Sequence, residues 1–166
     1  MKDAGGTQTV VATVTAAGLE PVTRLVVYAE ARLLAVTYGP TMTYVEDRAA
    51  VHSFTTAWHL ARHRAIAVGL PTYAAGLRRA DPSLGACLLL RAAGDCQTDV
   101  VAMARGVAPD GVPSVRVRVG RLVVRAYDLA AVLQIGALWE QAAGLARALP
   151  PIARPEAARP ARRART

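Results

Sequence analysis

The chain of 166 residues carries 20 basic and 12 acidic side chains, for a formal net charge of +8, and 53% of its residues are hydrophobic. Its length suits one domain with a single core, because halves of about 65 residues would each be marginal alone. Alanine inflates the hydrophobic fraction and no run of about 18 apolar residues occurs, so we expect no membrane-spanning segment. The start of the chain lacks the pattern of a secretory signal, which favours a cytoplasmic location.

The first part of the chain is predicted to form four strands followed by a helix. Strand-like runs cover residues 9–15 and 24–30, and a third strand ends near Tyr38. A Gly39-Pro40 turn leads into a strand from Thr41 to Glu46. Asp47 then stands where it can accept from the first amides of a helix. The inner side of that helix is expected to hold Val51, Phe54, Trp58, Ala61 and Ala65.

The second part follows the same plan after a loop near residues 69–85, which contains the Asp81-Pro82 turn signal. Strands are predicted at residues 86–91 and 98–104. A hairpin joins residues 114–119 to 122–127, and its two-residue loop with glycine first suits a type II′ turn. Asp128 is expected to cap a helix from Leu129 to Leu149, which stops at a Pro-Pro pair.

The two parts also resemble one another in sequence. Residues 36–61 align without gaps with residues 117–142, with eight identities in 26 positions. The matches include the turn glycine, the capping aspartate and the only two tryptophans. Self-similarity at a fixed offset predicts a repeated architecture. We therefore expect an α+β fold, with one domain over residues 1–149 built from a duplicated β4-α unit (about 8–67 and 84–149). The two units would be related by a pseudo-two-fold axis and would form two antiparallel sheets or one continuous sheet, with two long helices.

A unit of four strands and a helix that occurs twice is similar, at the level of topology, to the Whirly-type and related folds that bind single-stranded nucleic acids. The similarity rests on topology alone, since no family motif can be carried over residue by residue. It adds nucleic-acid binding to the functions considered, although a fold by itself does not fix a function.

Two groups of residues also point to nucleic acid. The predicted hairpin places Arg116, Arg118, Arg125 and Tyr127 on one face of a sheet, where cations can meet phosphates and a ring can stack on bases. Residues 150–166 are rich in Arg, Pro and Ala and should form a disordered basic tail with contacts from Arg159, Arg162, Arg163 and Arg165. The alternatives are an ordinary solvent face of a half-buried sheet and a compositional bias toward arginine.

All three histidines fall within a narrow arc of the first predicted helix, nearly opposite Trp58. The pair His59 and His63 has the spacing of a zinc-binding pair, but this helix supplies no carboxylate on that face. We expect no metal site there, and instead a solvated or partner-facing basic surface formed by Arg48, His52, His59 and His63. The two cysteines, Cys87 and Cys96, lack zinc-site spacing and are expected to be reduced thiols.

The sequence contains no nucleophile elbow, paired carboxylates, phosphate loop or metal-ligand cluster, so we predict no catalytic residues and no cofactor. The leading hypothesis is a non-catalytic protein that binds nucleic acid, single-stranded or without sequence preference, through the arginine-bearing sheet face and the tail. The alternative is a homo-oligomeric interaction or assembly module, in which strand edges and helix faces pair with another copy or another protein. A third is a ligand-binding or enzymatic domain with a pocket between the halves.

Overall fold

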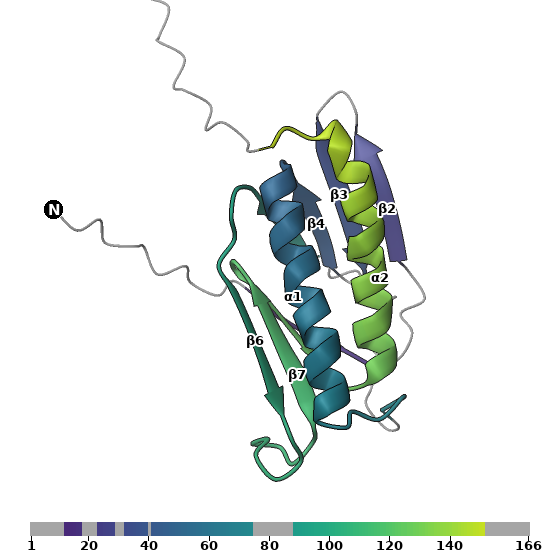
Figure 1. The fold of residues 1–166 in the computed structure, drawn as a ribbon, viewed down its shortest axis with the longest axis vertical. Coiled ribbons are helices and arrows are strands. Elements are labelled where there is room, and N and C mark those ends of the chain that lie inside the picture. The colour runs from purple at the N-terminus through teal and green to yellow at the C-terminus, as the bar shows by residue number, and fades with distance from the viewer. Residues whose placement is uncertain (1–11, 18–22, 29–31, 40, 75–87, 152–166) are drawn as a thin grey trace, which may run out of the picture.

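The computed structural model describes residues 12–17, 23–28, 32–39, 41–74 and 88–151 (Figure 1). The predicted order of four strands and a helix, followed by four more strands and a helix, is confirmed. The class is α+β, with two four-stranded sheets and two helices. The elements are β1 (Ala12–Ala16), β2 (Thr23–Tyr28), β3 (Leu33–Tyr38), β4 (Thr41–Val45), α1 (Arg48–Ala67), β5 (Leu88–Ala92), β6 (Thr98–Met103), β7 (Ser114–Val119), β8 (Leu122–Ala126), α2 (Leu129–Leu145) and a closing 3-10 turn, η2 (Ala146–Ala148).

The sheets have the strand orders β1-β8-β7-β6 and β2-β3-β4-β5, and we call them the first and the second sheet. The first strand of each half lies in the sheet of the other half. It pairs there in parallel, β1 with β8 and β5 with β4, while the other neighbours are antiparallel. Both sheets are therefore mixed, and the expectation of antiparallel sheets was wrong for these two edge strands. Hydrophobic alternation shows which face of a strand is buried but not which strand lies beside it, so it could not reveal the exchange.

The two exchanged strands pair in the same register. Ala12 lies opposite Leu122, the first residue of β8, and Leu88 lies opposite Thr41, the first residue of β4. Each parallel pair is extended by one further bond just beyond its strands. The amide of Tyr127 donates to the carbonyl of Ala16 at 3.1 Å, and the amide of Glu46 donates to that of Ala92 at 3.0 Å.

Both predicted hairpins are present. Val119 lies opposite Leu122 across the Gly120-Arg121 loop. Gly120 has φ of +58°, and among the described residues of that loop it alone has a positive φ, as a type II′ turn requires. Tyr38 lies opposite Thr41 in the other hairpin. Two residues therefore separate the paired strands in each hairpin, as the sequence predicted.

The helices run side by side in opposite directions on one side of the two sheets (Figure 1). α1 packs on β6 and β7, whereas α2 packs on β2 and β3, so each helix covers strands of the other half. The first two amides of each helix also donate to carbonyls that follow the other helix. The pairs are Arg48 to Pro150 (2.9 Å), Ala49 to Pro151 (3.2 Å), Leu129 to Pro71 (2.8 Å) and Ala130 to Thr72 (3.1 Å). Two residues placed in the predicted tail, Pro150 and Pro151, thus contact the folded domain.

The predicted capping aspartates both begin their helices, and each also ties down a distant segment. The Oδ1 of Asp47 accepts from the amide of Ala50 at 2.8 Å, and its Oδ2 accepts from the amide of Gly94 at 2.7 Å. The two oxygens of Asp128 accept from Ala131 and Ala74, each at 2.9 Å. Both carboxylates are fully buried, and each accepts from amides in two separate parts of the chain.

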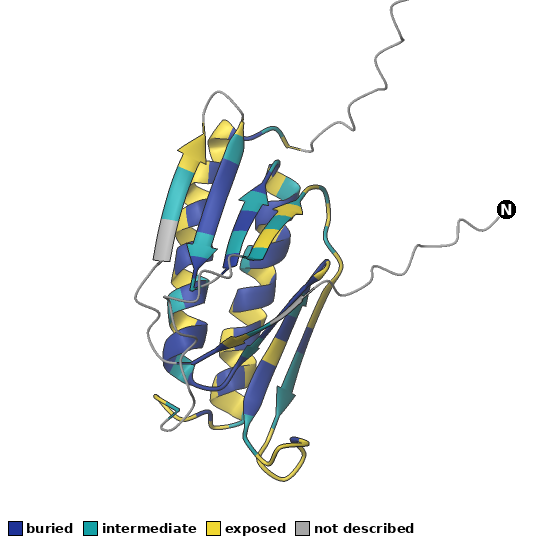
Figure 2. Ribbon diagram, turned by 180° about the vertical axis from the view of Figure 1, so that it is seen from behind, coloured by how far each residue is buried: buried dark blue, intermediate teal, exposed yellow. Residues whose placement is uncertain are grey.

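The core lies between the helix layer and the inner faces of the sheets (Figure 2). The five α1 residues predicted to face inward are all buried, as are both tryptophans. Trp139 of α2 stacks on Phe54 of α1, with ring centroids 4.1 Å apart and the planes within 10° of parallel. The tryptophan therefore joins helix to helix.

The helical segment Leu129–Ala148 is long and apolar enough to cross a membrane by length and mean hydropathy alone. This test is a different one from the search for a run of about 18 apolar residues, because it allows charged residues within the window. The same composition is found in the core helices of soluble proteins, and one face of α2 is buried against α1 and the second sheet. This helix is by itself weak evidence for a membrane span.

Candidate functional site

Four of the residues predicted to bind nucleic acid lie together on the outward face of the first sheet, away from the helices. Arg116 and Arg118 alternate along β7 with the buried Val115, Val117 and Val119. Arg125 lies opposite Arg116 on β8, and Tyr127 follows just after that strand. The alternation that predicted this arrangement therefore placed each of the four side chains correctly.

Two of the three arginines on this face are paired with carboxylates. Arg116 lies 3.3 Å from Asp99 of β6, and Arg125 lies 3.0 Å from Asp110 in the loop between β6 and β7. The Nε of Arg118 donates to the carbonyl of Gly120 at 3.2 Å. Three positive charges thus share their surface with two negative charges, which leaves a formal charge of +1. Sequence reasoning missed both pairs, because the aspartates lie 15 and 17 residues from the arginines that they meet.

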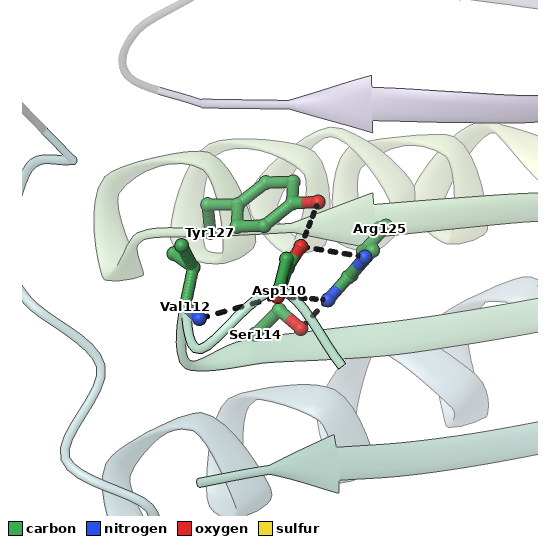
Figure 3. A network of polar contacts seen from close by, with 5 residues as sticks. All are labelled: Asp110, Val112, Ser114, Arg125 and Tyr127. Carbon is green, nitrogen blue, oxygen red and sulfur yellow. Dashed lines mark hydrogen bonds and ion pairs between the residues drawn. The ribbon is translucent and has the colours of Figure 1, made fainter. Parts of the chain in front are cut away.

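The contacts of Asp110 form a polar network at the end of β8 (Figure 3). Arg125 donates from Nη2 to Oδ1 of Asp110 at 3.0 Å, and its Nη1 lies 3.0 Å from Oδ2, so the guanidinium holds the carboxylate with both arms. The hydroxyl of Tyr127 contacts Oδ2 at 3.4 Å. Behind this pair, the Nε of Arg125 donates to the buried Ser114 at 3.0 Å. The guanidinium also lies over the ring of Tyr127, 4.8 Å from its centroid.

The protonation of this network follows from the same contacts. The amide of Val112 and the guanidinium of Arg125 hold the pKa of Asp110 below its ordinary value of 3.8. Burial raises the pKa of Tyr127, which keeps its hydroxyl protonated and able to donate. At neutral pH the network is therefore an anion held by an arginine fork and a phenol.

The outward face of the second sheet is more apolar, although it also carries the ion pair of Arg91 with Glu46, 2.7 Å apart, beside Tyr44. Leu89 of β5 is 59% exposed and Tyr28 of β2 is 44% exposed. Tyr28 packs against Tyr44 of β4 with ring centroids 6.2 Å apart. Val26 and Met42 lie on the same face and are half-buried. We call these five uncharged residues the apolar sheet face; sequence reasoning did not select it, although the alternation along β4 could have indicated it.

The outer face of α1 carries the predicted histidines, and all three are exposed. The Nε2 of His59 lies 3.5 Å from Oε1 of Glu140 on α2, so the carboxylate missing from α1 is supplied by the other helix. The Nε of Arg48 donates to the carbonyl of Leu149 at 3.0 Å, so one donor of this exposed side chain is used within the chain. A groove of about 240 Å³ between the helices is lined by His59, Glu140 and apolar residues that include Leu133.

A second cavity, of about 330 Å³, lies where the two sheets meet, between β5 and the turn of the β7-β8 hairpin. Its lining includes Thr43, Phe54 and Cys96, whose thiol is not in a disulfide. Burial, with smaller contributions from nearby carboxylates, raises the pKa of Cys96, which disfavours the reactive thiolate. Within the described parts of the chain, no three His, Cys, Asp or Glu side chains are grouped to hold a metal ion.

The other predicted contacts, Arg159, Arg162, Arg163 and Arg165, lie outside the described residues, as does Cys87. No family model, no curated protein and no solved structure matches this chain. The topological similarity to Whirly-type folds therefore stays a prediction, and the argument for a function rests on the surfaces described above.

Proposed function

We propose that this chain is a non-catalytic interaction module that associates with a second copy of itself through the second sheet. The observation that carries the proposal is the apolar sheet face. Exposed faces of antiparallel sheet are normally polar, and a contiguous exposed apolar patch on a soluble domain marks a contact site. Here that face carries two tyrosines, a methionine and an exposed leucine beside one ion pair, Arg91 with Glu46, while the corresponding face of the first sheet carries three arginines and two aspartates.

The edge of the same sheet supports association between identical chains. β2 is an edge strand, and an edge strand offers unpaired backbone donors and acceptors to another chain. Its four described side chains are apolar or aromatic, and Val27 is 40% exposed although it faces the helix side. The corresponding edge strand of the first sheet, β6, carries Asp99 instead. Antiparallel pairing of β2 with β2 of a second copy would continue both apolar sheet faces across a two-fold axis.

We also propose that the two halves are an internal duplication related by a pseudo-two-fold axis. The sequence identities, the equal registers of the exchanged strands and the reciprocal contacts at the helix starts support it. Under this relation Arg116, Arg118 and Arg125 correspond to Ala35, Thr37 and Tyr44. The two outward faces would then have diverged, one toward charge and one toward apolar contact.

At micromolar concentration the chain is expected to be a dimer, and Tyr28→Glu, on the edge strand β2 and on the apolar sheet face, is expected to raise the dissociation constant by about 100-fold, because an unpaired carboxylate is costly to bury. Sedimentation equilibrium measures both. Leu60→Glu is the matched control, since Leu60 is 41% exposed against 44% for Tyr28 but lies on α1. A wild-type chain that stays monomeric at about 100 µM, or an equal effect of the two variants, contradicts the proposal.

The second candidate function is binding to nucleic acid, and the Arg125 network favours it. An arginine fork beside a tyrosine is an arrangement that receives phosphate groups. The last 20 residues, with six arginines and one glutamate, would add attraction that does not depend on sequence. The pairing of Arg116 and Arg125 with aspartates places this candidate second, because it lowers the positive charge of the folded face.

If the basic tail of residues 150–166 binds nucleic acid, replacing Arg162, Arg163 and Arg165 with Gln should weaken binding to a labelled single-stranded oligonucleotide and reduce the salt dependence of that binding. Each lost phosphate contact lowers the slope of log K against log salt by about 0.7. Fluorescence anisotropy over a salt series measures both. The comparison chain should end at Pro151, because its carbonyl contacts α1. An unchanged slope would remove the tail from the mechanism, and no binding at low salt would end this candidate.

A further inference from the structure

We propose that Ser114, Arg125 and Tyr127 form a phosphate-binding site that the carboxylate of Asp110 occupies as an internal competitor. The carboxylate takes both arms of the Arg125 fork and also contacts the hydroxyl of Tyr127 (Figure 3). A guanidinium fork fits the oxygens of a phosphate as well as those of a carboxylate. A phosphate group is thus the ligand chemistry that would replace Asp110.

The receptor side of this site is held in place without Asp110. The Nε of Arg125 donates to Ser114, which is fully buried, and the guanidinium lies over the ring of Tyr127, which is only 8% exposed. These contacts fix the side chain from behind, so the two outer arms of the fork keep their aim when the anion in front of them changes. Preorganised donors of this kind bind an anion without a further loss of side-chain freedom.

The competitor, in contrast, belongs to an exposed loop. The backbone hydrogen bonds described within residues 104–111 join loop residues to one another, and the amide of Val112 donates to Asp110 itself. Because these bonds lie within the loop, they do not fix its position relative to the sheet. Gly106, Pro109 and Gly111 interrupt any regular structure there, and Gly111 has φ of +68°. The contacts of Asp110 with Arg125 and Tyr127 therefore form a latch between the loop and the sheet, and an incoming phosphate would open it.

The neighbouring pair of Arg116 and Asp99 provides a matched comparison. Both of its members lie on paired strands, and both side chains are about half exposed, at 46% and 50%. Among the described residues, no serine bonds to the Arg116 guanidinium and no aromatic ring lies under it. Asp110→Asn and Asp99→Asn add the same charge to the same face, but only the first opens a prepared site.

The test uses the full chain with inorganic phosphate and, separately, a single-stranded oligonucleotide. Asp110→Asn is expected to bind inorganic phosphate about tenfold more tightly than the wild type, with a shift of the Arg125 Nε–H signal in NMR spectra. Asp99→Asn should change the affinity by about twofold or less. Adding Arg125→Gln to Asp110→Asn should remove the gain. Equal gains in the two asparagine variants, or no phosphate binding by Asp110→Asn, would overturn the proposal.

Thermal unfolding of each variant shows whether the fold is retained, and Asp110→Ala repeats the test by removing the carboxylate entirely. The oligonucleotide arm distinguishes the source of the phosphate. Gains for both probes assign the site to a nucleic-acid strand, whereas a gain for inorganic phosphate alone assigns it to a small phosphate compound and counts against nucleic-acid binding. Oligonucleotide binding that no change at Asp110 affects, together with no gain for inorganic phosphate, would support the second proposed function and overturn this site.

Discussion

The two halves of this chain, separated by a cut within residues 75–87, are expected to be unfolded when alone and to form the native fold when mixed. Neither half contains a complete sheet, because β1 completes the sheet of the second half and β5 that of the first. Each helix packs on strands of the other half, and its first two amides bond to the chain that follows the other helix. A separated half would leave these backbone groups and apolar faces without their partners.

Circular dichroism and proton NMR spectra of the separate and mixed fragments measure this outcome. The mixture should regain the spectrum of the intact chain, and its thermal midpoint should rise with fragment concentration, as mass action requires for two associating chains. A cut in the loop between β6 and β7 is the control, because it leaves β5 in the same fragment as β2, β3 and β4 and so keeps the second sheet within one fragment. A folded first fragment with dispersed NMR signals would contradict the exchange of strands.

Local signals in the sequence were sufficient for the elements of this fold. Strict alternation along residues 114–119 predicted both the strand and its buried face, and a glycine followed by one residue predicted the turn. The two capping aspartates predicted where the helices begin. These features depend on a residue and its neighbours within about four positions, so a single sequence contains them.

The pairing of strands could not be predicted from such local signals. β1 and β8 are separated by more than 100 residues, and the periodicity of either strand is compatible with several neighbours. The same limit applied to the charged face. The alternation located Arg116 and Arg125 correctly, but the carboxylates that meet them come from another strand and from a loop. The sequence therefore predicted where the arginines lie, and the structure was needed to find what they contact.

The apolar sheet face illustrates a different limit. Tyr28 and Tyr44 are 16 residues apart and belong to β2 and β4, so their contact depends on the sheet rather than on either strand. Aromatic and branched residues favour strands wherever they occur, so neither residue stands out in the sequence. Whether such residues form a contact surface or the core depends on whether they are exposed in the folded chain. Their exposure follows from how the sheets assemble, which the sequence of one strand does not show.

Replacing Asp47 with Ala is expected to lower the free energy of unfolding by about 2–4 kcal/mol, of which about 1 is the lost helix cap and the rest the cost of a stranded amide. The stranded amide is that of Gly94, which now donates to Oδ2 at 2.7 Å. Asp128→Ala should have an effect of the same size, because Asp128 bonds the amides of Ala131 and Ala74 in the same way. Each change removes a large share of the 5–15 kcal/mol that is typical of a domain.

Urea unfolding at neutral pH measures the loss, and two substitutions separate its parts. Asp47→Asn keeps an oxygen that can accept from the amide of Ala50, but its amide group cannot accept from Gly94. Because the helix cap is kept, its loss of unfolding free energy should be smaller than that of Asp47→Ala. Asp95→Ala, at the exposed neighbour of Gly94, should change stability by about 0.5 kcal/mol or less. The double variant of Asp47 and Asp128 should not fold, because each carboxylate joins the start of a helix to a segment from elsewhere in the chain. Losses below about 1 kcal/mol at both positions would mean that packing alone holds the helix starts in place.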